Sequence, residues 1–482
     1  MKLALAPVAV SFAYKEALES QLAGRTWSAP VWVINDLRAP LEGAVRAELL
    51  GVDGASVAAA TLPVHVNADD KAEAGSFALT LPKQAGVYIL RATLTAPELA
   101  APIIETSYIK VIEPAFAQTP RVLLIGQRKY AEPIVEMLNA LGAQVDVYDE
   151  NRLDAMESDL RDGAALHLKY DAIWLASFEA LAKVLPERSA QAIADAVKQG
   201  TGFIHSGGDG SFHGGHGHAA IVEATALGDV LPVSISGNSD VIWGQYTLAN
   251  TLRDQPAIHE IKVASPASPA LAALASELKR IGIEGFNRTE VRAGSRVLMT
   301  VAGDPLLVTG SYGLGHTVAY TGFTPAADEF TGTTMDNQWA YRPATRTQMQ
   351  SFAEMLALAL PGGAEWKREV LEQRATPLFE TLKNLPQAKL ETTLPGCEPA
   401  EGGGLCRLRI HSTQGFAHLV HLRMEWISTQ PYFAELSDND FEMLPGETHE
   451  IELRWRSGDP EAAVHGVWVL DAANAPETRR GF

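Results

Sequence analysis

The chain is poor in cysteine, in positive charge and in long apolar segments. Its 482 residues contain only two cysteines, Cys397 and Cys406. Lys and Arg number 39 against 58 Asp and Glu, which gives a formal net charge of −19. This balance repels nucleic acid and anionic membrane surfaces, so neither is expected as a partner. The sequence has no run of about 18 apolar residues, so no transmembrane helix is expected.

The two cysteines stand close together in the segment CEPAEGGGLC. The eight residues between them include one proline and three glycines, so the segment can fold back as a hairpin. A disulfide between Cys397 and Cys406 would indicate an oxidising compartment, and hence a periplasmic or secreted protein. Two unpaired thiols are the alternative. A zinc site is not expected, because the segment offers no second pair of ligands.

The opening segment MKLALAPVAVSFA supports two interpretations. It has one Lys followed by an apolar stretch, and Ala13 fits the end of a signal-peptide cleavage site. Pro7 interrupts the apolar stretch, however, and the same residues are suited to a first β-strand. The sequence therefore predicts either a signal peptide or a strand here.

Length and patterning together predict several domains. Residues 1–116 contain short segments, such as SFALTLP (76–82) and GVYILRATL (86–94), that alternate apolar with polar or small residues. This alternation is typical of half-buried strands and predicts an immunoglobulin-like β-sandwich. A second sandwich of this type is expected at 387–482. Residues 363–386 are charged and helical in pattern, which predicts a connector.

Residues 118–362 have a different pattern, which predicts a flavodoxin-like α/β domain. The segment RVLLIG (121–126) is continuously apolar, as in a strand buried on both faces. Strands that alternate with helices indicate parallel βαβ units. The expected strands are 121–126, 144–149, 171–177 and 201–205, followed by the later segments 296–303 and 305–323. The expected helices are 132–142 (ending at Gly142), 189–200 and 347–360.

Two segments resemble glycoside hydrolase family 2 enzymes of the β-mannosidase type. VWVINDLRAPLEG (31–43) is similar to the sandwich that follows their catalytic barrel. LSDNDFEMLPGETHEIEL (436–453) is similar to their last sandwich, where Ser-Asp-Asn-x-Phe precedes Leu-Pro-Gly-Glu. Nothing in the chain resembles the barrel or its paired carboxylates. The resemblance therefore implies a non-catalytic accessory region in bacterial carbohydrate metabolism, whose partners are the other domains of a glycosidase; any glycosidase activity would reside in a missing barrel.

Three further segments resemble the glutamine amidotransferase-like domains of bacteria: GTGFIHSGGDGSFHGG (200–215), LGDVLPV (227–233) and DPLLVTGSYGLGHTVAYT (304–321). A class I amidotransferase uses a cysteine on a sharp turn after a strand, activated by a histidine. The loop after strand 201–205 is the place for that turn, because parallel sheets bind ligands at the carboxyl ends of their strands. Residues 118–362 contain no cysteine. The resemblance thus implies a degenerate domain, used for packing, assembly or carbohydrate binding.

The segment HSGGDGSFHGGHGH (205–218) holds the candidate site residues. His205, Ser206 and Asp209 are catalytic candidates, although Ser206 lacks the Gly-x-Ser-x-Gly frame and also fits a turn cap. Imidazoles can bind a metal ion. The glycines and the spacing, however, equally indicate a loop with solvated histidines. The alternative function is a stand-alone hydrolase with its site in this loop, with metal assistance as one version. The candidate metal ligands are His213, His216 and His218.

The remaining motifs are weaker. YGLGH (312–316) lacks a third glycine and precedes a strand, so no dinucleotide cofactor is expected and a tight hairpin is predicted. Loop aromatic residues can stack on sugar rings or pack in a core, which leaves carbohydrate as a candidate ligand and a homo-oligomer as an open alternative. These aromatic and neighbouring polar residues are Trp243, Asp336, Asn337, Trp339 and Tyr341.

Overall fold

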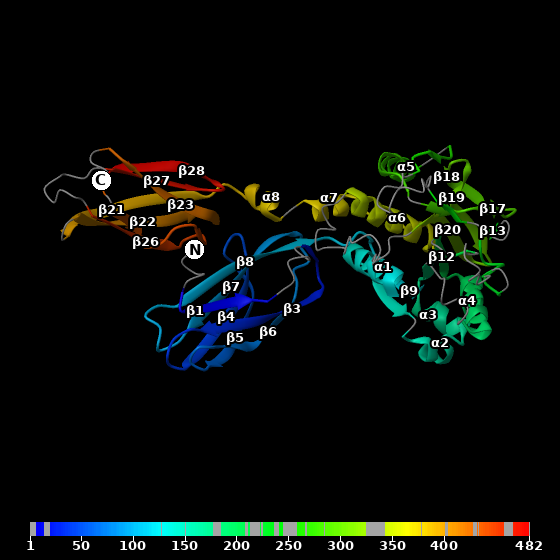
Figure 1. Cartoon of the computed structure of the whole chain (residues 1–482), viewed down its shortest axis with the longest axis horizontal. Helices are drawn as coiled ribbons and strands as arrows, with labels where there is room; N and C mark the ends of the chain where they lie inside the picture. Colours follow the sequence, from blue (N-terminus) through cyan, green and yellow to red (C-terminus); the bar gives the residue numbers. More distant parts are fainter. Residues whose placement is uncertain are drawn as a thin grey trace, which may run out of the picture. The chain divides into compact units, whose positions relative to one another are not determined.

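The computed structural model divides the chain into two compact units. One unit combines Met1–Glu113 with Thr376–Phe482, and the other is Pro114–Ala375. Figure 1 shows the elements along the chain. The structure describes residues 6–13, 20–126, 128–149, 151–176, 185–207, 211–212, 222, 225–235, 241–243, 258–265, 268–283, 285–323, 343–376, 378–400, 403–427, 431, 433–456 and 466–481.

The N-terminal β domain consists of two sheets around one core. The sheet orders are β1-β3-β6 and β2-β8-β7-β4-β5. Val31 and Val33 from the smaller sheet and Val45 and Leu90 from the larger one belong to the same buried cluster. Alternation of buried and exposed residues along β3 follows from the period of two in a strand. The strands are β1 (Val8–Phe12), β2 (Ser20–Leu22), β3 (Thr26–Asn35), β4 (Leu41–Gly51), β5 (Ser56–Val66), β6 (Asp70–Thr80), β7 (Gly86–Thr95) and β8 (Ile103–Ile112).

The C-terminal β domain also has two sheets around a single core. Their orders are β21-β22-β26-β24 and β25-β23-β27-β28, and Leu408, Ile451 and Trp468 are among the buried residues between them. The short helix α8 (Leu378–Lys383) precedes these strands. The strands are β21 (Lys389–Ala400), β22 (Gly403–Gln414), β23 (Ala417–Trp426), β24 (Phe433–Leu436), β25 (Phe441–Met443), β26 (Thr448–Arg456), β27 (Gly466–Ala472) and β28 (Ala475–Gly481).

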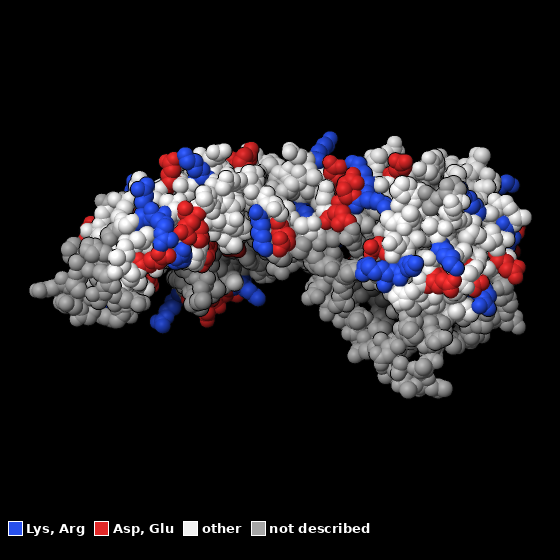
Figure 2. Space-filling view, turned by 90° about the horizontal axis from the view of Figure 1, so that it is seen from above, with Lys and Arg blue, Asp and Glu red and all other residues white. Residues whose placement is uncertain are grey.

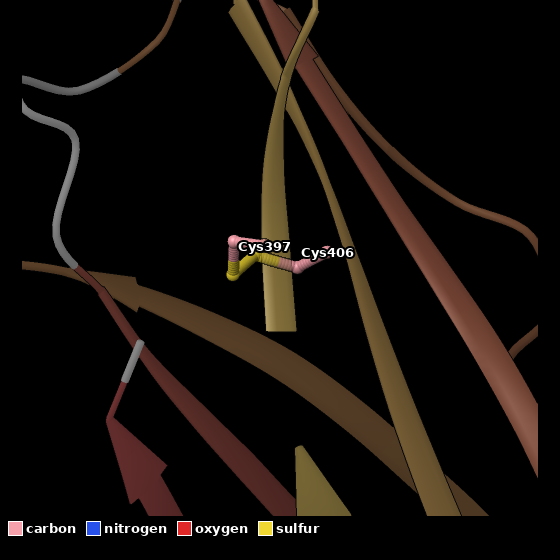
Figure 3. Close-up of a disulfide and its surroundings, with 2 residues drawn as sticks. All are labelled: Cys397 and Cys406. Carbon is pink, nitrogen blue, oxygen red and sulfur yellow. A yellow bond between two sulfur atoms is a disulfide. The ribbon is translucent and has the colours of Figure 1, made fainter. Parts of the chain in front are cut away.

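A disulfide joins the hairpin β21–β22 of this domain (Figure 3). Cys397 and Cys406 are direct cross-strand partners, with their Cα atoms 4.1 Å apart. Cys406 is fully buried, whereas Cys397 lies on the edge strand and is exposed. The chain's two thiols are therefore paired with each other, outside the α/β unit.

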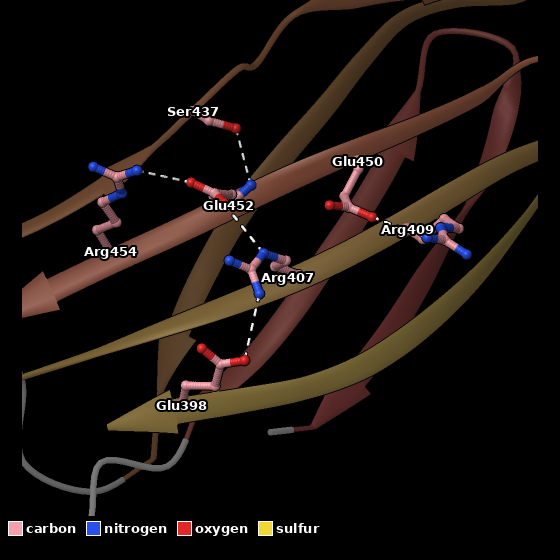
Figure 4. A network of polar contacts seen from close by, with 7 residues as sticks. All are labelled: Glu398, Arg407, Arg409, Ser437, Glu450, Glu452 and Arg454. Carbon is pink, nitrogen blue, oxygen red and sulfur yellow. Dashed lines mark hydrogen bonds and ion pairs between the residues drawn. The ribbon is translucent and has the colours of Figure 1, made fainter. Parts of the chain in front are cut away.

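Charged side chains form a network on the outer face of the sheet β21-β22-β26-β24 (Figure 4). Arg407 Nε lies 3.1 Å from Glu452, whose other carboxylate oxygen lies 2.9 Å from Arg454. A separate cross-strand pair, Arg409 and Glu450, is 3.1 Å apart. Opposite charges facing each other across strands suit a solvated sheet face. Acidic and basic residues are also interleaved on the face of the molecule in Figure 2.

The α/β unit is built on one long sheet. Its parallel part has the order β10-β9-β11-β12-β20, and antiparallel strands β19, β18 and β15 extend it. In chain order the parallel part reads 2-1-3-4-5, which is the order of flavodoxin-like sheets. The strands are β9 (Arg121–Gly126), β10 (Gln144–Tyr148), β11 (Ala172–Ala176), β12 (Gly202–Gly207), β13 (Val233–Ile235), β14 (Val241–Trp243), β15 (Ile261–Val263), β16 (Gly285–Asn287), β17 (Thr289–Val291), β18 (Arg296–Val301), β19 (Asp304–Tyr312) and β20 (Gly315–Phe323).

Helices cover both faces of this sheet. Leu175 and Phe203 point to the face covered by α2, α3 and α4, and share a core with Met156 and Ile193. On the other face Trp174 packs edge-on against Phe352 of α6, with ring centroids 5.4 Å apart. None of the helices within the described ranges is both long and apolar enough to cross a membrane. The helices are α1 (Arg128–Leu141), α2 (Leu153–Asp159), α3 (Gly163–Lys169), α4 (Glu187–Gln199), α5 (Pro269–Ile281), α6 (Pro343–Ala359) and α7 (Glu369–Ala375).

Most elements expected from the sequence are confirmed. The strand 121–126 is β9, and the helix 132–142 is part of α1, which Gly142 follows with a φ of 98°. Residues 305–323 form two strands, β19 and β20, joined by a tight hairpin in which Tyr312 pairs with Gly315. Val8–Phe12 is a strand, as one of the two interpretations of the opening segment requires.

The predicted connector 363–386 does not form one element. It contains two short helices, α7 and α8, and the boundary between the two compact units falls between them at Ala375 and Thr376. Contacts between the N-terminal and C-terminal β domains place both domains in one compact unit. The sequence pattern does not indicate this association.

Candidate functional site

The candidate site lies where β12 ends at the carboxyl edge of the parallel sheet. β12 is an inner strand between β11 and β20, and its pairing with β20 becomes irregular between Ser206 and Gly207. A Cβ atom on Gly207 would lie 2.3 Å from the carbonyl oxygen of Thr321 and 2.6 Å from that of Gly322. The backbones therefore approach so closely that only glycine fits at this position.

Ser206 is fully buried, and its hydroxyl is held by hydrogen bonds. The indole Nε1–H of Trp174 donates to Ser206 Oγ over 3.0 Å, and that hydroxyl lies 3.4 Å from the carbonyl oxygen of Leu175. Ser211 Oγ donates to the main-chain carbonyl of Ser206. A nucleophile must reach its substrate and a base. The Ser206 hydroxyl instead links β12 to the neighbouring strand β11.

His205 is also fully buried, and it occupies the opposite face of the sheet. Its Nε2 lies 3.0 Å from the carbonyl oxygen of Ser211, and its ring packs against Phe212 at a centroid distance of 4.3 Å. Burial lowers the pKa of His205 from 6.5 to about 4, although the hydrogen bond to the backbone of Ser211 works in the other direction. The imidazole is therefore neutral near pH 7.

The structure does not bring His205 and Ser206 together as a catalytic pair. Adjacent residues of a strand point to opposite faces of the sheet. His205 accordingly contacts Phe212 on one face, while Ser206 meets the indole of Trp174 on the other. A histidine that cannot reach the hydroxyl cannot serve as its general base.

The remaining candidate residues fall largely outside the described part of the chain. The main chain of Trp243 is described and ends β14 opposite Gly285 of β16, but its side chain lies outside the described part. Within the described residues, no group of three or more His, Cys, Asp or Glu side chains is arranged to hold a metal ion. The candidates outside the described residues are Asp209, His213, His216, His218, Asp336, Asn337, Trp339 and Tyr341.

The strand order places the topological switch point beside β12 rather than at it. The chain order reverses between β9 and β11, and sheets of this kind bind ligands in the crevice at such a point. The strands end there at Gly126 and Ala176, and a Cβ atom on Gly126 would lie 2.4 Å from the Ala176 carbonyl oxygen. The position at which sheets of this order bind ligands is therefore one strand away from the turn that the sequence singles out.

Trp174 is the residue of this site that sequence reasoning misses. In the sequence, Trp174 is one of several apolar residues of the expected strand 171–177, and nothing marks it as a hydrogen-bond donor to the site. The parallel register pairs Trp174 with Ile204, so Ser206, two residues further on, lies on the same face of the sheet. That register is the signal that could have predicted the contact.

The first family 2-like segment, 31–43, contains a buried side chain with a structural role. Asn35 has no exposed surface. Its Nδ2 donates to the carbonyl oxygens of Ala39 and Asn67, each at 2.9 Å, and its Oδ1 accepts from the main-chain N–H of Leu37 at 3.1 Å. This asparagine therefore fixes the turn between β3 and β4.

The second family 2-like segment, 436–453, has comparable contacts. Asn439 pairs with the backbone of Leu422: its Oδ1 accepts from the N–H at 2.6 Å and its Nδ2 donates to the carbonyl at 2.9 Å. Glu447 accepts from the N–H of Leu444 at 2.7 Å and so closes the Leu-Pro-Gly-Glu turn. In both segments, the characteristic polar residues satisfy the backbone.

A shallow, open groove lies along α4. Its lining contains charges of both signs, so it does not favour an anion over a cation. The lining residues are Arg161, Glu187, Arg188, Gln191, Ala192 and Asp195.

Comparison with solved structures finds remote likenesses. A cytoplasmic protein of Salmonella typhimurium LT2 is 18% identical, covers 48% of this chain and 98% of its own, and has a TM-score of 0.34. A second Salmonella typhimurium cytoplasmic protein is 16% identical, with coverage of 57% and 96% and a TM-score of 0.36. TM-scores this low do not show a common fold. No curated protein matches the chain.

A family model gives the more specific result. The model described as "Putative glutamine amidotransferase" matches residues 163–341. The match begins at α3 and includes β12 and β20. It does not extend to the two segments that resemble glycoside hydrolase family 2. The α/β unit therefore contains a glutamine amidotransferase-like domain.

Proposed function

We propose that the chain is a non-catalytic accessory region of a glycoside hydrolase family 2-like, β-mannosidase-like protein. Its amidotransferase-like domain serves packing, assembly or carbohydrate binding. One observation carries this proposal: at the end of β12, Ser206 is buried and its hydroxyl is held by Trp174. Hydrolysis of glutamine by the class I route needs a thiolate at such a turn. The chain's two cysteines are joined to each other in the C-terminal β domain.

The proposal includes a domain assignment. Residues 1–116 and 387–482 are immunoglobulin-like β-sandwiches, 118–362 is the amidotransferase-like domain and 363–386 is the connector. In support, each β region consists of two sheets around one core. Paired sheets of this kind are the architecture of the immunoglobulin class.

The link to family 2 proteins rests on the resemblance of 31–43 and 436–453. Asn35 and Asn439 each use both ends of the amide to bind backbone groups. Polar residues with a structural role fit an accessory β domain, because they stabilise turns without facing a substrate. Function on a shared fold is decided by its site, so this link needs a direct test.

The first experiment measures ammonia release from glutamine and labelling by an electrophilic glutamine analogue, 6-diazo-5-oxonorleucine. We expect neither turnover nor a covalent adduct. An adduct on Ser206, or ammonia release that is lost in Ser206→Ala, would overturn the proposal. Ser158→Ala is the matched control, because Ser158 is an exposed serine of the same unit.

The second experiment separates the accessory role from the alternative hydrolase. We expect no hydrolysis of aryl mannosides or aryl glucosides, and no stoichiometric metal in protein prepared without a histidine tag. A stoichiometric metal ion, together with hydrolysis lost in His205→Ala or Asp209→Ala, would favour a metal-assisted hydrolase with its site at 205–218. Binding to a glycan array would instead assign the accessory role to carbohydrate.

A further inference from the structure

The outer face of one sheet in the N-terminal β domain carries buried apolar residues that do not belong to that domain's core. Leu50 of β4 and Ile89 of β7 are 4% and 1% exposed, and both lie in a separate cluster with Phe416, which is 3% exposed. Phe416 precedes β23 of the C-terminal β domain. Leu444, in the turn before β26, packs against the same cluster. Apolar side chains of this size are buried here only because the two β domains meet.

A bidentate ion pair borders this cluster. Arg91 of β7 contacts the two carboxylate oxygens of Glu447 at 2.7 and 3.2 Å. The Arg91 side chain is 14% exposed and that of Glu447 is 35% exposed. The planar guanidinium matches the carboxylate in this geometry. The pair therefore fixes the orientation of the two domains where the apolar contact alone would not.

A second polar cluster joins the same two domains. His418 Nδ1 lies 2.9 Å from the hydroxyl of Tyr108 and 3.0 Å from Glu442 Oε1. The Tyr108 and His418 rings also meet edge-on, with centroids 5.4 Å apart. Burial and the neighbouring Glu442 raise the pKa of Tyr108, so its hydroxyl remains protonated and can donate. Tyr108 comes from β8, whereas its two partners come from β23 and β25.

The segments that lead out of this unit and back into it are also held together. Lys110 of β8 is 6% exposed, and its Nζ donates to the carbonyl oxygen of Thr376 over 2.9 Å. Within the α/β unit, the main-chain N–H of Lys367 donates to the carbonyl oxygen of Ala115 over 2.7 Å. The departing and returning segments are thus paired in each unit.

We propose that the outer face of the sheet β2-β8-β7-β4-β5 is a docking surface for the C-terminal β domain of the same chain. Three contacts join the domains: Ile89 packs in one cluster with Phe416, Arg91 pairs with Glu447, and Tyr108 meets His418. We call these three contacts the latch. This latch, rather than the covalent path through residues 114–375, holds the two β domains together. The α/β unit is then an insertion into one β assembly. This inference is independent of the proposed function.

The test cuts the full chain where it passes from the α/β unit back to the β domains. A site for a specific protease is inserted between Ala375 and Thr376, which leaves the Thr376 carbonyl on the C-terminal piece. After cleavage, we expect both pieces to elute together in gel filtration at micromolar concentration. Separation of the wild-type pieces without denaturant would overturn the proposal.

Variants then test the residues of the latch. We expect Phe416→Ala and Arg91→Ala each to weaken association of the cut pieces at least about tenfold, because central aromatic and arginine contacts dominate interfaces. Arg46→Ala, which removes an exposed arginine from β4 of the same sheet, is the matched control. Equal affinities for Arg91→Ala, Phe416→Ala and Arg46→Ala would also contradict the proposal.

A double-mutant cycle keeps the test decisive if a single variant disturbs folding. Arg91→Ala combined with Glu447→Ala should weaken association less than the sum of the two single effects, since each single change already breaks the ion pair. Additive effects would exclude the pair from the latch. Circular dichroism of the uncut variants checks that both domains remain folded.

Discussion

Two regions of this molecule are rich in polar side chains, and they differ in their access to water. At the end of β12, His205, Ser206 and Ser211 are fully buried. On the outer face of the sheet β21-β22-β26-β24, Arg407 and Glu452 form ion pairs in solvent. A buried polar group is costly unless it is hydrogen-bonded, whereas an exposed pair adds little. The comparison predicts that stability depends on the first region and hardly on the second.

The largest effect is expected at Gly207. Replacement by Ala forces its Cβ against the carbonyl oxygens of Thr321 and Gly322, which should destabilise the α/β unit by up to about 3 kcal/mol. Hydrogen exchange read by mass spectrometry over β12 and β20 measures this loss. Gly481→Ala is the control, because the nearest atom to a Cβ added at that glycine is 3.9 Å away. Unchanged protection in Gly207→Ala would show that the strands can separate at little cost.

A smaller effect is expected at Ser206. In Ser206→Ala the buried indole N–H of Trp174 loses its acceptor, which should cost about 2 kcal/mol of unfolding free energy. Exchange over β11 and β12 reports it, with exposed Ser158→Ala for comparison. Ser206→Thr should retain part of the stability, since it keeps the hydroxyl. If Ser206→Ala leaves stability intact, the hydroxyl has no structural role.

His205 should make the stability of the α/β unit dependent on pH. Its pKa falls from 6.5 in the unfolded chain to about 4 on burial, so only the unfolded state binds a proton between these values. Stability should therefore decrease as the pH falls from about 7 to about 5.5, by about 1 kcal/mol. Wild type and His205→Phe are compared by urea unfolding at both pH values, with exposed His65→Gln as the control. A pH dependence that survives in His205→Phe would assign it to other groups.

The smallest effect is expected on the solvated sheet. Arg407→Ala breaks the contacts with Glu398 and Glu452, but both partners remain hydrated. We expect no measurable change in the thermal unfolding of the C-terminal β domain, at low or high salt. A clear loss of stability in Arg407→Ala would remove the distinction between the two regions.

Local patterns allowed much of the fold to be predicted. The apolar run 121–126 coincides with β9, because a strand buried on both faces needs apolar residues throughout. Cys397 and Cys406 were also predictable as a pair, since a short glycine-rich segment brings them into register. In such cases the deciding interactions lie within a few residues along the sequence.

Contacts between distant segments could not be predicted in this way. The bond from Trp174 to Ser206 depends on the register of two parallel strands, and the latch pairs Arg91 with a residue 356 positions away. Neither residue type nor spacing identifies such partners. The placement of His205 and Ser206 on opposite faces was open to prediction, because side chains alternate along any strand, although the sequence makes both residues catalytic candidates.

The two segments that connect the α/β unit to the β domains lie side by side, and this has a consequence for how such proteins can exchange modules during evolution. Lys110 is held to Thr376 on one side, and Ala115 to Lys367 on the other. A module attached by two neighbouring segments can be removed or replaced by joining two points that already touch, so the host loses no core residue. Homologous chains with a different module, or only a short loop, at this position would therefore keep the β assembly unchanged.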